Sequence, residues 1–244
     1  MTDALFLACF GDVAAGDIVE VSGTEARHAV AVRRTTVGES VLISDGRGRA
    51  IRGPVVTAEK TRLAVEVAEI LWAPERRHRF VAVQALAKGD RSERAVETMT
   101  ELGVDEILAW QASRSIVRWT GERREKSLAK WSSAAREATK QSRRLRVPQV
   151  SFATTAGVAE RIRAAGCALI LHESADIPIG RADLPDEGEI LLIIGPEGGV
   201  APEELEEFQR LGAQPVLISD AVLRTSTAGA VALGQLSLLL QQLR

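Results

Sequence analysis

The segment from Leu191 to Val200, LLIIGPEGGV, is the strongest candidate for a ligand-binding turn in this chain. An apolar run typical of a buried strand leads into a glycine-rich turn, and Pro202 marks the start of a helix. In an open α/β sheet, ligands bind at the carboxyl ends of the strands, where glycines let backbone amides approach closely. From spacing alone, an ordinary strand-to-helix turn with positive φ angles explains the glycines equally well.

The same turn does not match the common phosphate-binding loops. No Gly-Lys-Ser or Gly-Lys-Thr follows the glycines, and the spacing is not that of the dinucleotide fingerprint G-x-G-x-x-G. Glu197 inside the turn argues further against a bound polyanion. We therefore expect Gly195, Gly198 and Gly199 to bring backbone amides close to a ligand that is not held by its phosphates.

A second junction, VLISDAVLRTSTAGAVALG, joins a strand that ends near Ser219 to a helix that begins at Thr225 to Thr227. Helix capping is the simplest interpretation of the hydroxyl groups. Arg224, however, is a single cation beside an otherwise apolar helix, which is more typical of a site than of a solvated face. The helix itself, from Ser226 to Leu243, is apolar around most of its circumference, which predicts burial in the core or at a subunit interface.

The stretch from Arg118 to Arg146 is strongly basic in a chain whose net charge is only −2. It holds ten Lys or Arg residues and three acids, a balance that suits binding to RNA phosphates. A solvated helix face with salt bridges is the alternative, and Glu122 and Glu125 favour it for the first turns. For the end from Lys140 to Arg146, where no acid interrupts the run, we expect RNA contact.

Other chemistries find no support in the sequence. His28, His78 and His172 do not pair with Cys or carboxylates at metal-ligand spacing, and no G-x-S-x-G elbow indicates a hydrolase. Cys9 and Cys167 lie in apolar surroundings, so we expect two core thiols, no disulfide and a reducing cytoplasm. No apolar run reaches the roughly 18 residues of a membrane span, and no signal peptide is evident. We expect a soluble, cytoplasmic protein.

Two domains, 1–72 and 73–244, are expected to position these residues. The runs ALFLACF, DIVEVSG, ESVLISDG and RLAVEVAEIL predict a small β-barrel-like domain with one helix over 24–33, for which Thr24 is a candidate cap. After a linker that begins at Trp72, strands in FVAVQAL, EILAW, CALILHE, EILLIIG and PVLIS alternate with helices over 92–103, 122–142, 155–165 and 202–211. This alternation predicts an α/β fold with a largely parallel sheet covered on both faces.

Five motifs in register, LAKGDRSERAVETMTELGVDEI, REATKQSRRLRVP, LILHE, IIGPEGG and LRTSTA, resemble the RsmE-type family of ribosomal RNA uridine methyltransferases in the SPOUT class. The resemblance spans essentially the whole chain, and the HAVAVRR and LISDGRG stretches resemble that family's PUA-like RNA-binding barrel. It implies a SPOUT-type α/β fold with a trefoil knot, which is rare among folds. It also implies a homodimer that uses S-adenosylmethionine, without metal, to methylate N3 of a uridine in 16S rRNA of the small ribosomal subunit.

The resemblance assigns the cofactor to three loops and suggests where RNA binds. The expected cofactor-binding residues are Leu171, His172, Glu173, Ile194, Gly195, Pro196, Gly198, Gly199, Leu217, Ile218, Ser219, Leu223 and Thr225. The expected RNA-binding residues are Arg33, Arg34, Lys88, Arg114, Lys140, Arg143, Arg144 and Arg146. The family pattern has Glu at the position of Lys140 and Gly at that of Arg143, so this chain departs toward more positive charge.

Two catalytic roles follow as hypotheses. Arg224, or one of Arg143 and Arg144, stabilises the negative charge that develops on a uracil carbonyl as N3 loses its proton. Glu197 is a candidate proton acceptor, although a carboxylate in a turn also serves simply to fix the loop. A SPOUT enzyme acting on another RNA and a non-catalytic RNA-binding protein remain the alternative functions.

Overall fold

The computed structural model describes residues 3–241 and divides into two compact units. Of the described residues, the first unit contains 3–75 and 139–147, and the second contains 76–138 and 148–241. The segment 139–147 lies beyond the sequence-based boundary at residue 72, yet its contacts place it with the first unit. The long helix α3 (Gly121–Ser142) therefore contributes residues to both units.

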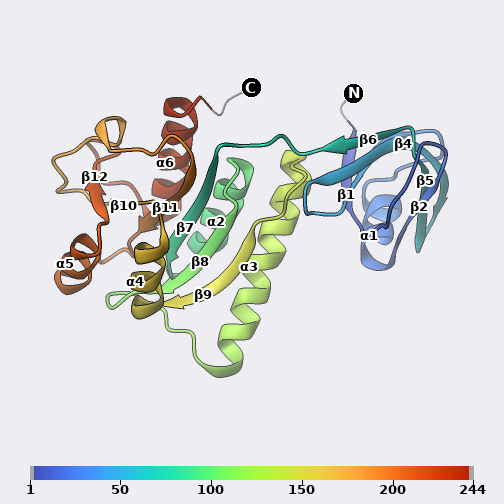
Figure 1. Cartoon of the computed structure of the whole chain (residues 1–244). Helices are drawn as coiled ribbons and strands as arrows, with labels where there is room; N and C mark the ends of the chain where they lie inside the picture. The colour runs from blue at the N-terminus through green and yellow to red at the C-terminus, as the bar shows by residue number, and fades with distance from the viewer. Residues whose placement is uncertain (1–2, 242–244) are drawn as a thin grey trace. The chain divides into compact units, whose positions relative to one another are not determined.

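The first unit is a six-stranded sheet that curls around its main apolar core (Figure 1). The strand order is β1-β3-β4-β5-β2, with β6 paired to β4. β1 and β3 are parallel, and the other pairs are antiparallel. Its elements are β1 (Ala4–Leu7), β2 (Ile18–Ser22), α1 (Gly23–Arg27), the π-helical turn η1 (His28–Val32), β3 (Ser40–Ser44), β4 (Arg49–Glu59), β5 (Arg62–Glu66) and β6 (Glu69–Trp72).

The sequence did not reveal β4, the longest strand of this unit, because Gly53-Pro54 and two arginines interrupt its apolar pattern. Gly53 is required by close approach, since a Cβ there would lie 1.7 Å from the carbonyl oxygen of Glu66. The single run expected over RLAVEVAEIL is split into β5 and β6, which pair with different parts of β4. The candidate cap Thr24 lies inside α1, whose N-cap is Ser22.

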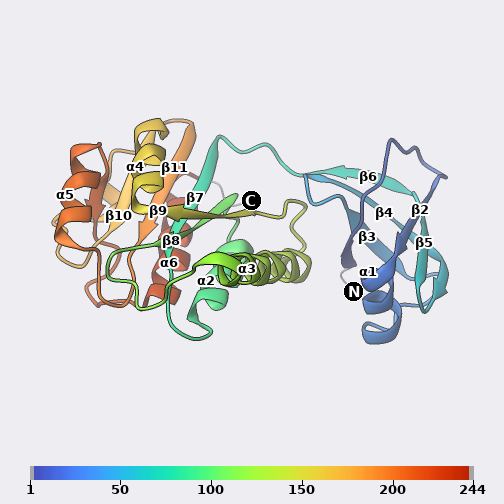
Figure 2. The same cartoon turned by 90° about the horizontal axis from the view of Figure 1, so that it is seen from below.

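The second unit is a parallel six-stranded sheet in the order β12-β10-β11-β7-β8-β9. One face packs on α2, α3 and α6 and the other on α4 and α5, as the strand–helix alternation predicts (Figures 1 and 2). The remaining elements are β7 (His78–Ala85), α2 (Arg91–Glu101), β8 (Glu106–Gln111), β9 (Gln149–Thr154), α4 (Thr155–Ala164), β10 (Cys167–Leu171), the 3-10 turn η2 (Ile179–Arg181), β11 (Gly188–Ile194), α5 (Pro202–Arg210), β12 (Gln214–Val216) and α6 (Thr225–Leu239).

β9 was also missed from the sequence, because this edge strand alternates polar and apolar residues instead of forming a continuous apolar run. α6 begins at Thr225, as expected, and the predicted end at Leu243 lies outside the described residues. No helix within residues 3–241 is long and apolar enough to cross a membrane. The trefoil knot stays a prediction from the family resemblance.

The end of α3 explains why glycine suits the position of Arg143. The N–H of Arg143 donates to the carbonyl of Lys140 at 3.2 Å, and that of Arg144 donates to the carbonyl of Thr139 at 3.0 Å. This pair of bonds is a Schellman motif, which places its C′ residue in the left-handed region. Arg143 occupies that position with a φ of 55°, where a side chain is strained.

We therefore expect Arg143→Gly to raise the free energy of unfolding by about 1 kcal/mol, because glycine adopts a positive φ without the Cβ clash. Urea unfolding monitored by circular dichroism measures this change. Arg143→Ala is the matched control, since it removes the same charge and keeps the strain. Equal stabilisation by both variants would show that charge, and not backbone conformation, is responsible.

Candidate functional site

Three loops converge at the carboxyl edge of the parallel sheet. β10 lies between β11 and β12, and the register pairs Leu171 with both Ile194 and Val216. The loops that follow these strands therefore leave the sheet at the same level. These loops, with the strand ends Leu171 and Ile194 and the first residue of α6, Thr225, contain all thirteen residues that the sequence assigned to a cofactor.

A cavity of about 370 Å³ lies between these loops. Nine of the predicted cofactor residues line it: Leu171, His172, Glu173, Ile194, Gly195, Pro196, Gly199, Leu223 and Thr225. The two predicted catalytic residues, Arg224 and Glu197, line it as well. Four lining residues, Arg91, Val200, Val222 and Ala228, were not singled out from the sequence, and the α2 residue Arg91 is far from the glycine turn along the chain.

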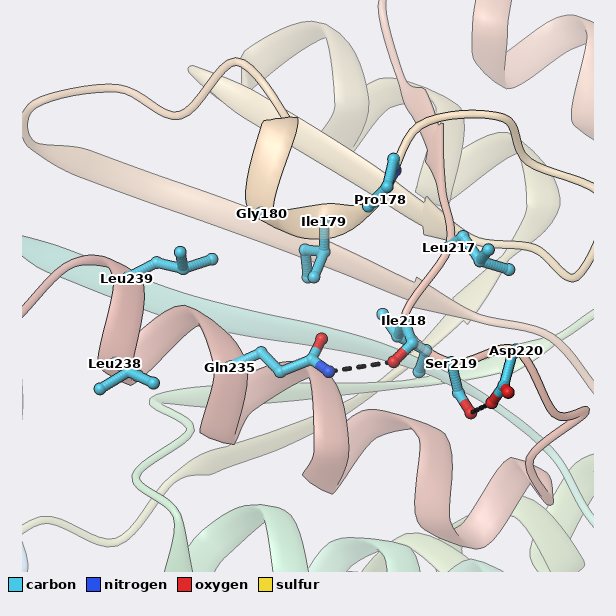
Figure 3. A pocket seen from close by; sticks show the side chains of 10 residues that line it. All are labelled: Pro178, Ile179, Gly180, Leu217, Ile218, Ser219, Asp220, Gln235, Leu238 and Leu239. Carbon is cyan, nitrogen blue, oxygen red and sulfur yellow. Dashed lines mark hydrogen bonds between the residues drawn. The ribbon is translucent and has the colours of Figure 1, made fainter.

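The other predicted cofactor residues lie outside that lining. Leu217, Ile218 and Ser219 line a neighbouring, open apolar cavity of about 440 Å³ between η2 and α6 (Figure 3). There the amide of Gln235 donates to the carbonyl of Ile218 at 2.9 Å. Gly198 faces the second unit's own Arg114, and a Cβ there would lie 3.5 Å from the Cβ of that arginine.

Two features of the glycine turn account for its glycines. Gly199 has a φ of 73°, and its N–H donates to the carbonyl of Pro196 at 2.9 Å, which closes the turn. A Cβ at Gly195 would lie 3.0 Å from a methyl group of Val200, a tight contact that Val200 could relieve only by moving by a few tenths of an ångström. The backbone geometry of the turn thus favours glycine, and the same glycines line the cavity. An ordinary strand-to-helix turn and a ligand-binding turn are therefore compatible interpretations of this segment.

A buried chain of hydrogen bonds joins the glycine turn to the start of α6. The Thr225 hydroxyl donates to the carbonyl of Gly195 at 2.7 Å, so its oxygen accepts from the Gln84 amide at 2.9 Å. Gln84 is fully buried near the end of β7. The sequence does not reveal its role, because Gln84 is a single polar residue inside the apolar run FVAVQAL and its partner Thr225 lies 141 positions away.

Glu197 anchors the turn to the beginning of α2. Its Oε1 accepts from the backbone N–H of Lys88 at 3.1 Å and from the Arg91 guanidinium at 3.1 Å. Burial acts to raise the pKa of Glu197. The hydrogen bonds from its own N–H, that of Lys88 and the Arg91 side chain outweigh burial and hold the pKa below its ordinary value. Glu197 is therefore ionised throughout the neutral range.

A second carboxylate, Glu204 in α5, holds the far side of the turn and is only 4% exposed. Its Oε1 accepts from the N–H and the hydroxyl of Ser113 at 2.9 and 2.8 Å, and from the Thr155 hydroxyl at 2.7 Å. Its Oε2 accepts from the N–H of Ala201 at 3.4 Å. These donors satisfy a buried charge that would otherwise be costly, and they tie the ends of β8 and β9 to α5.

Cations surround the glycine turn within the second unit. Lys88 and Arg114 are exposed, and the Arg114 guanidinium donates to the carbonyl of Gly198 at 3.3 Å. Arg224 is exposed at the N-cap of α6, beside the cavity. The positive charge expected to meet RNA therefore adjoins the cavity.

The predicted RNA-binding residues of the first unit divide into two groups. Arg33, Arg34, Arg143 and Arg146 are exposed, and Arg144 is half-buried. Lys140 is different, because its side chain is 9% exposed and its ammonium group pairs with Glu25 at 3.3 Å. RNA contact at Lys140 stays a prediction, because in this structure an acid of α1 that is remote in sequence engages its charge.

The whole chain is similar to solved methyltransferase structures. A ribosomal RNA small subunit methyltransferase E from Neisseria gonorrhoeae, bound to S-adenosylmethionine, has a TM-score of 0.87 at 26% identity, with 98% of each chain covered. A putative methyltransferase from Legionella pneumophila, in complex with the same cofactor, has a TM-score of 0.84 at 26% identity, again with 98% of each chain covered.

Sequence comparisons agree with the structural ones. Residues 74–237 match the family model described as an RNA methyltransferase domain, and residues 21–68 match that of an RNA methyltransferase PUA domain. A ribosomal RNA small subunit methyltransferase E from Mycobacterium bovis is 42% identical over 92% of this chain and 87% of its own length. One from Bacillus subtilis is 27% identical, with 92% and 91% covered. The chain therefore belongs to the ribosomal RNA small subunit methyltransferase E family.

Proposed function

We propose that this protein transfers the methyl group of S-adenosylmethionine to N3 of a uridine in the 16S rRNA of the small ribosomal subunit, in the cytoplasm. The observation that carries the proposal is the cavity formed by three loops at one sheet edge, which holds nine of the thirteen residues that the family motifs assign to the cofactor. Similar proteins with S-adenosylmethionine bound support the choice of cofactor.

The lining of the cavity suits this cofactor. Leu171, Ile194 and Ala228 provide an apolar surface for a flat base, and Gly195 and Gly199 of the glycine turn also line the cavity. Glu173 offers a negative charge, which suits the amino group at the amino-acid end of the molecule. When bound, S-adenosylmethionine supplies an already activated methyl group, so the protein must mainly align the nucleophile and manage one proton.

Two arginines differ in what they can do for the uracil. Arg224 is exposed beside the cavity, and in this proposal its guanidinium stabilises negative charge on a uracil carbonyl as N3 loses its proton. Arg91 is committed to Glu197 and fixes the turn. The lowered pKa of Glu197 makes its carboxylate a weak base, so we assign Glu197 to anchoring the turn and not to accepting the proton.

Nucleoside mass spectrometry after incubation with undermethylated small subunits and S-adenosylmethionine tests the proposed reaction. We expect 3-methyluridine with the wild-type protein and a loss of at least about a hundredfold in turnover with Arg224→Gln, because charge stabilisation in the transition state is removed. A methylated ribose or a methylated transfer RNA would identify a different substrate. Absence of S-adenosylmethionine binding in calorimetry would favour a non-catalytic RNA-binding protein.

The role of Glu197 is tested by Glu197→Gln. We expect turnover to fall less than about tenfold and the pH dependence from about pH 6 to 9 to keep its shape, whereas loss of a general base costs about a hundredfold or more. Because the pKa of Glu197 is lowered, its anchoring charge is present at neutral pH and is lost only as the pH falls through a pKa below that of an ordinary carboxyl group. A hundredfold fall with loss of an ionisation in the profile would instead establish Glu197 as the proton acceptor.

We also propose a homodimer formed through the end of α6. Leu238 and Leu239 are 67% and 43% exposed, and they border the open apolar cavity with Ile179 and Leu217 (Figure 3). Exposed apolar surface of this kind is typical of a subunit interface.

Light scattering coupled to gel filtration tests this interface. We expect a dimer for the wild type and a monomer for Leu238→Glu, because a charge buried at an apolar contact is unfavourable. Val32→Glu in the first unit is the matched control, since Val32 is 68% exposed and should leave the mass unchanged. A monomeric wild type at micromolar concentration would contradict the proposal.

A further inference from the structure

Trp72 is an exposed tryptophan in a chain whose other tryptophans are buried. Its exposed fraction is 69%, whereas Trp110, Trp119 and Trp131 are at most 6% exposed. It is the last residue of β6, and its cross-strand partner in β4 is Arg49. Single exposed apolar residues are common on protein surfaces, so exposure alone does not define a site. The residues around Trp72 are what indicate a binding site.

Arg49 supports the indole ring from within the first unit. Its guanidinium carbon lies 5.9 Å from the Trp72 ring centroid and 4.8 Å from that of Phe10. The same guanidinium pairs with Asp12 at 3.3 Å and donates to the carbonyls of Phe10, at 3.1 Å, and Gly11. With its side chain only 17% exposed, Arg49 is held in place, and it holds the indole by a cation–π contact.

Two further arginines lie beside the residue that follows Trp72. The N–H of Ala73 donates to the carbonyl of Gly48 at 2.6 Å. The guanidinium of Arg146 covers Gly48, where a Cβ would lie 2.7 Å from its Cζ, and it donates to the carbonyl of Arg47 at 2.7 Å. Arg47 and Arg146 are both exposed. A supported aromatic face is thus combined with two accessible positive charges.

We propose that Trp72 is a stacking site for an unpaired RNA base and that Arg47 and Arg146 bind the neighbouring phosphates. Proteins recognise unpaired nucleotides by this combination, because every base has a face that stacks and every linkage carries a negative charge. The basic surroundings favour RNA over an apolar protein partner. The inference rests on the proposed function in that RNA is the substrate, and it adds an RNA contact on the first unit that shares no residue with the lining of the cofactor cavity.

Tryptophan fluorescence provides a direct readout, because Trp72 is the exposed fluorophore among four. A short single-stranded oligoribonucleotide of mixed sequence, titrated into the full chain, should quench the wild-type emission. In Trp72→Phe the quenching should disappear while affinity, measured by anisotropy of a labelled oligonucleotide, stays within about threefold, since phenylalanine still stacks. Trp72→Ala and Trp72→Leu should each weaken binding about tenfold, the typical loss for one stacked base.

The charged and control variants separate the contributions. Arg47→Gln and Arg146→Gln should each reduce the slope of affinity against salt concentration by about one phosphate contact. Val37→Ala removes an apolar side chain that is 64% exposed in the same unit. It should change neither the affinity for RNA nor the dependence of that affinity on salt concentration. Unchanged RNA affinity in Trp72→Ala overturns the proposal, as does affinity in Trp72→Leu equal to that of the wild type.

Methylation assays distinguish failure of this inference from failure of the proposed function. In Trp72→Ala we expect a raised KM for RNA, an unchanged kcat and unchanged S-adenosylmethionine affinity. A wild type that makes 3-methyluridine together with a Trp72→Ala variant of identical KM would overturn the stacking site alone. A wild type that makes no 3-methyluridine, with RNA affinity that still falls in Trp72→Ala, would overturn the proposed function and support the stacking site.

Discussion

The Thr225 hydroxyl is the contact on which the geometry of the cavity depends. It has one hydrogen, which it donates to the carbonyl of Gly195, so it accepts from Gln84. Three segments remote in sequence, the end of β7, the glycine turn and the start of α6, are thereby held in one arrangement. Because all three partners are neutral, this link avoids the cost of burying a charge. It also fixes the orientation of the Gln84 amide, whose nitrogen must face Thr225.

Charged anchors complement this neutral link on the outer sides of the turn. Glu197 joins it to the start of α2, and the buried Glu204 joins α5 to the ends of β8 and β9. At the opposite edge of the sheet, Arg79 and Arg161 pair with Glu106 and Glu189 in a closed cluster. The parallel strands are therefore fixed at both edges, and the loops that line the cavity extend from a rigid base.

Local sequence patterns predicted those parts of the fold that depend on local forces. Apolar runs located β7, β8, β10 and β11, and the position of Pro202 located the start of α5. β4 was missed because the Gly53-Pro54 pair interrupts its apolar pattern. β9 was missed because it is an edge strand in which polar and apolar residues alternate. The pairing of Lys140 with Glu25 could not be foreseen, since a contact between residues 115 positions apart is set by tertiary structure.

The site was predictable where it depends on backbone geometry and unpredictable where it depends on long-range side-chain contacts. Glycines at a strand end identify the turn, because positive φ and close approach restrict the residue type. Gln84, Arg91 and Glu204 leave no such trace, because each acts through a partner on another element. Family motifs located the loops but not the residues that hold them together. The cavity is thus shaped by buried contacts and the cations around it are exposed, so binding of the cofactor and of the RNA depends on different physical interactions.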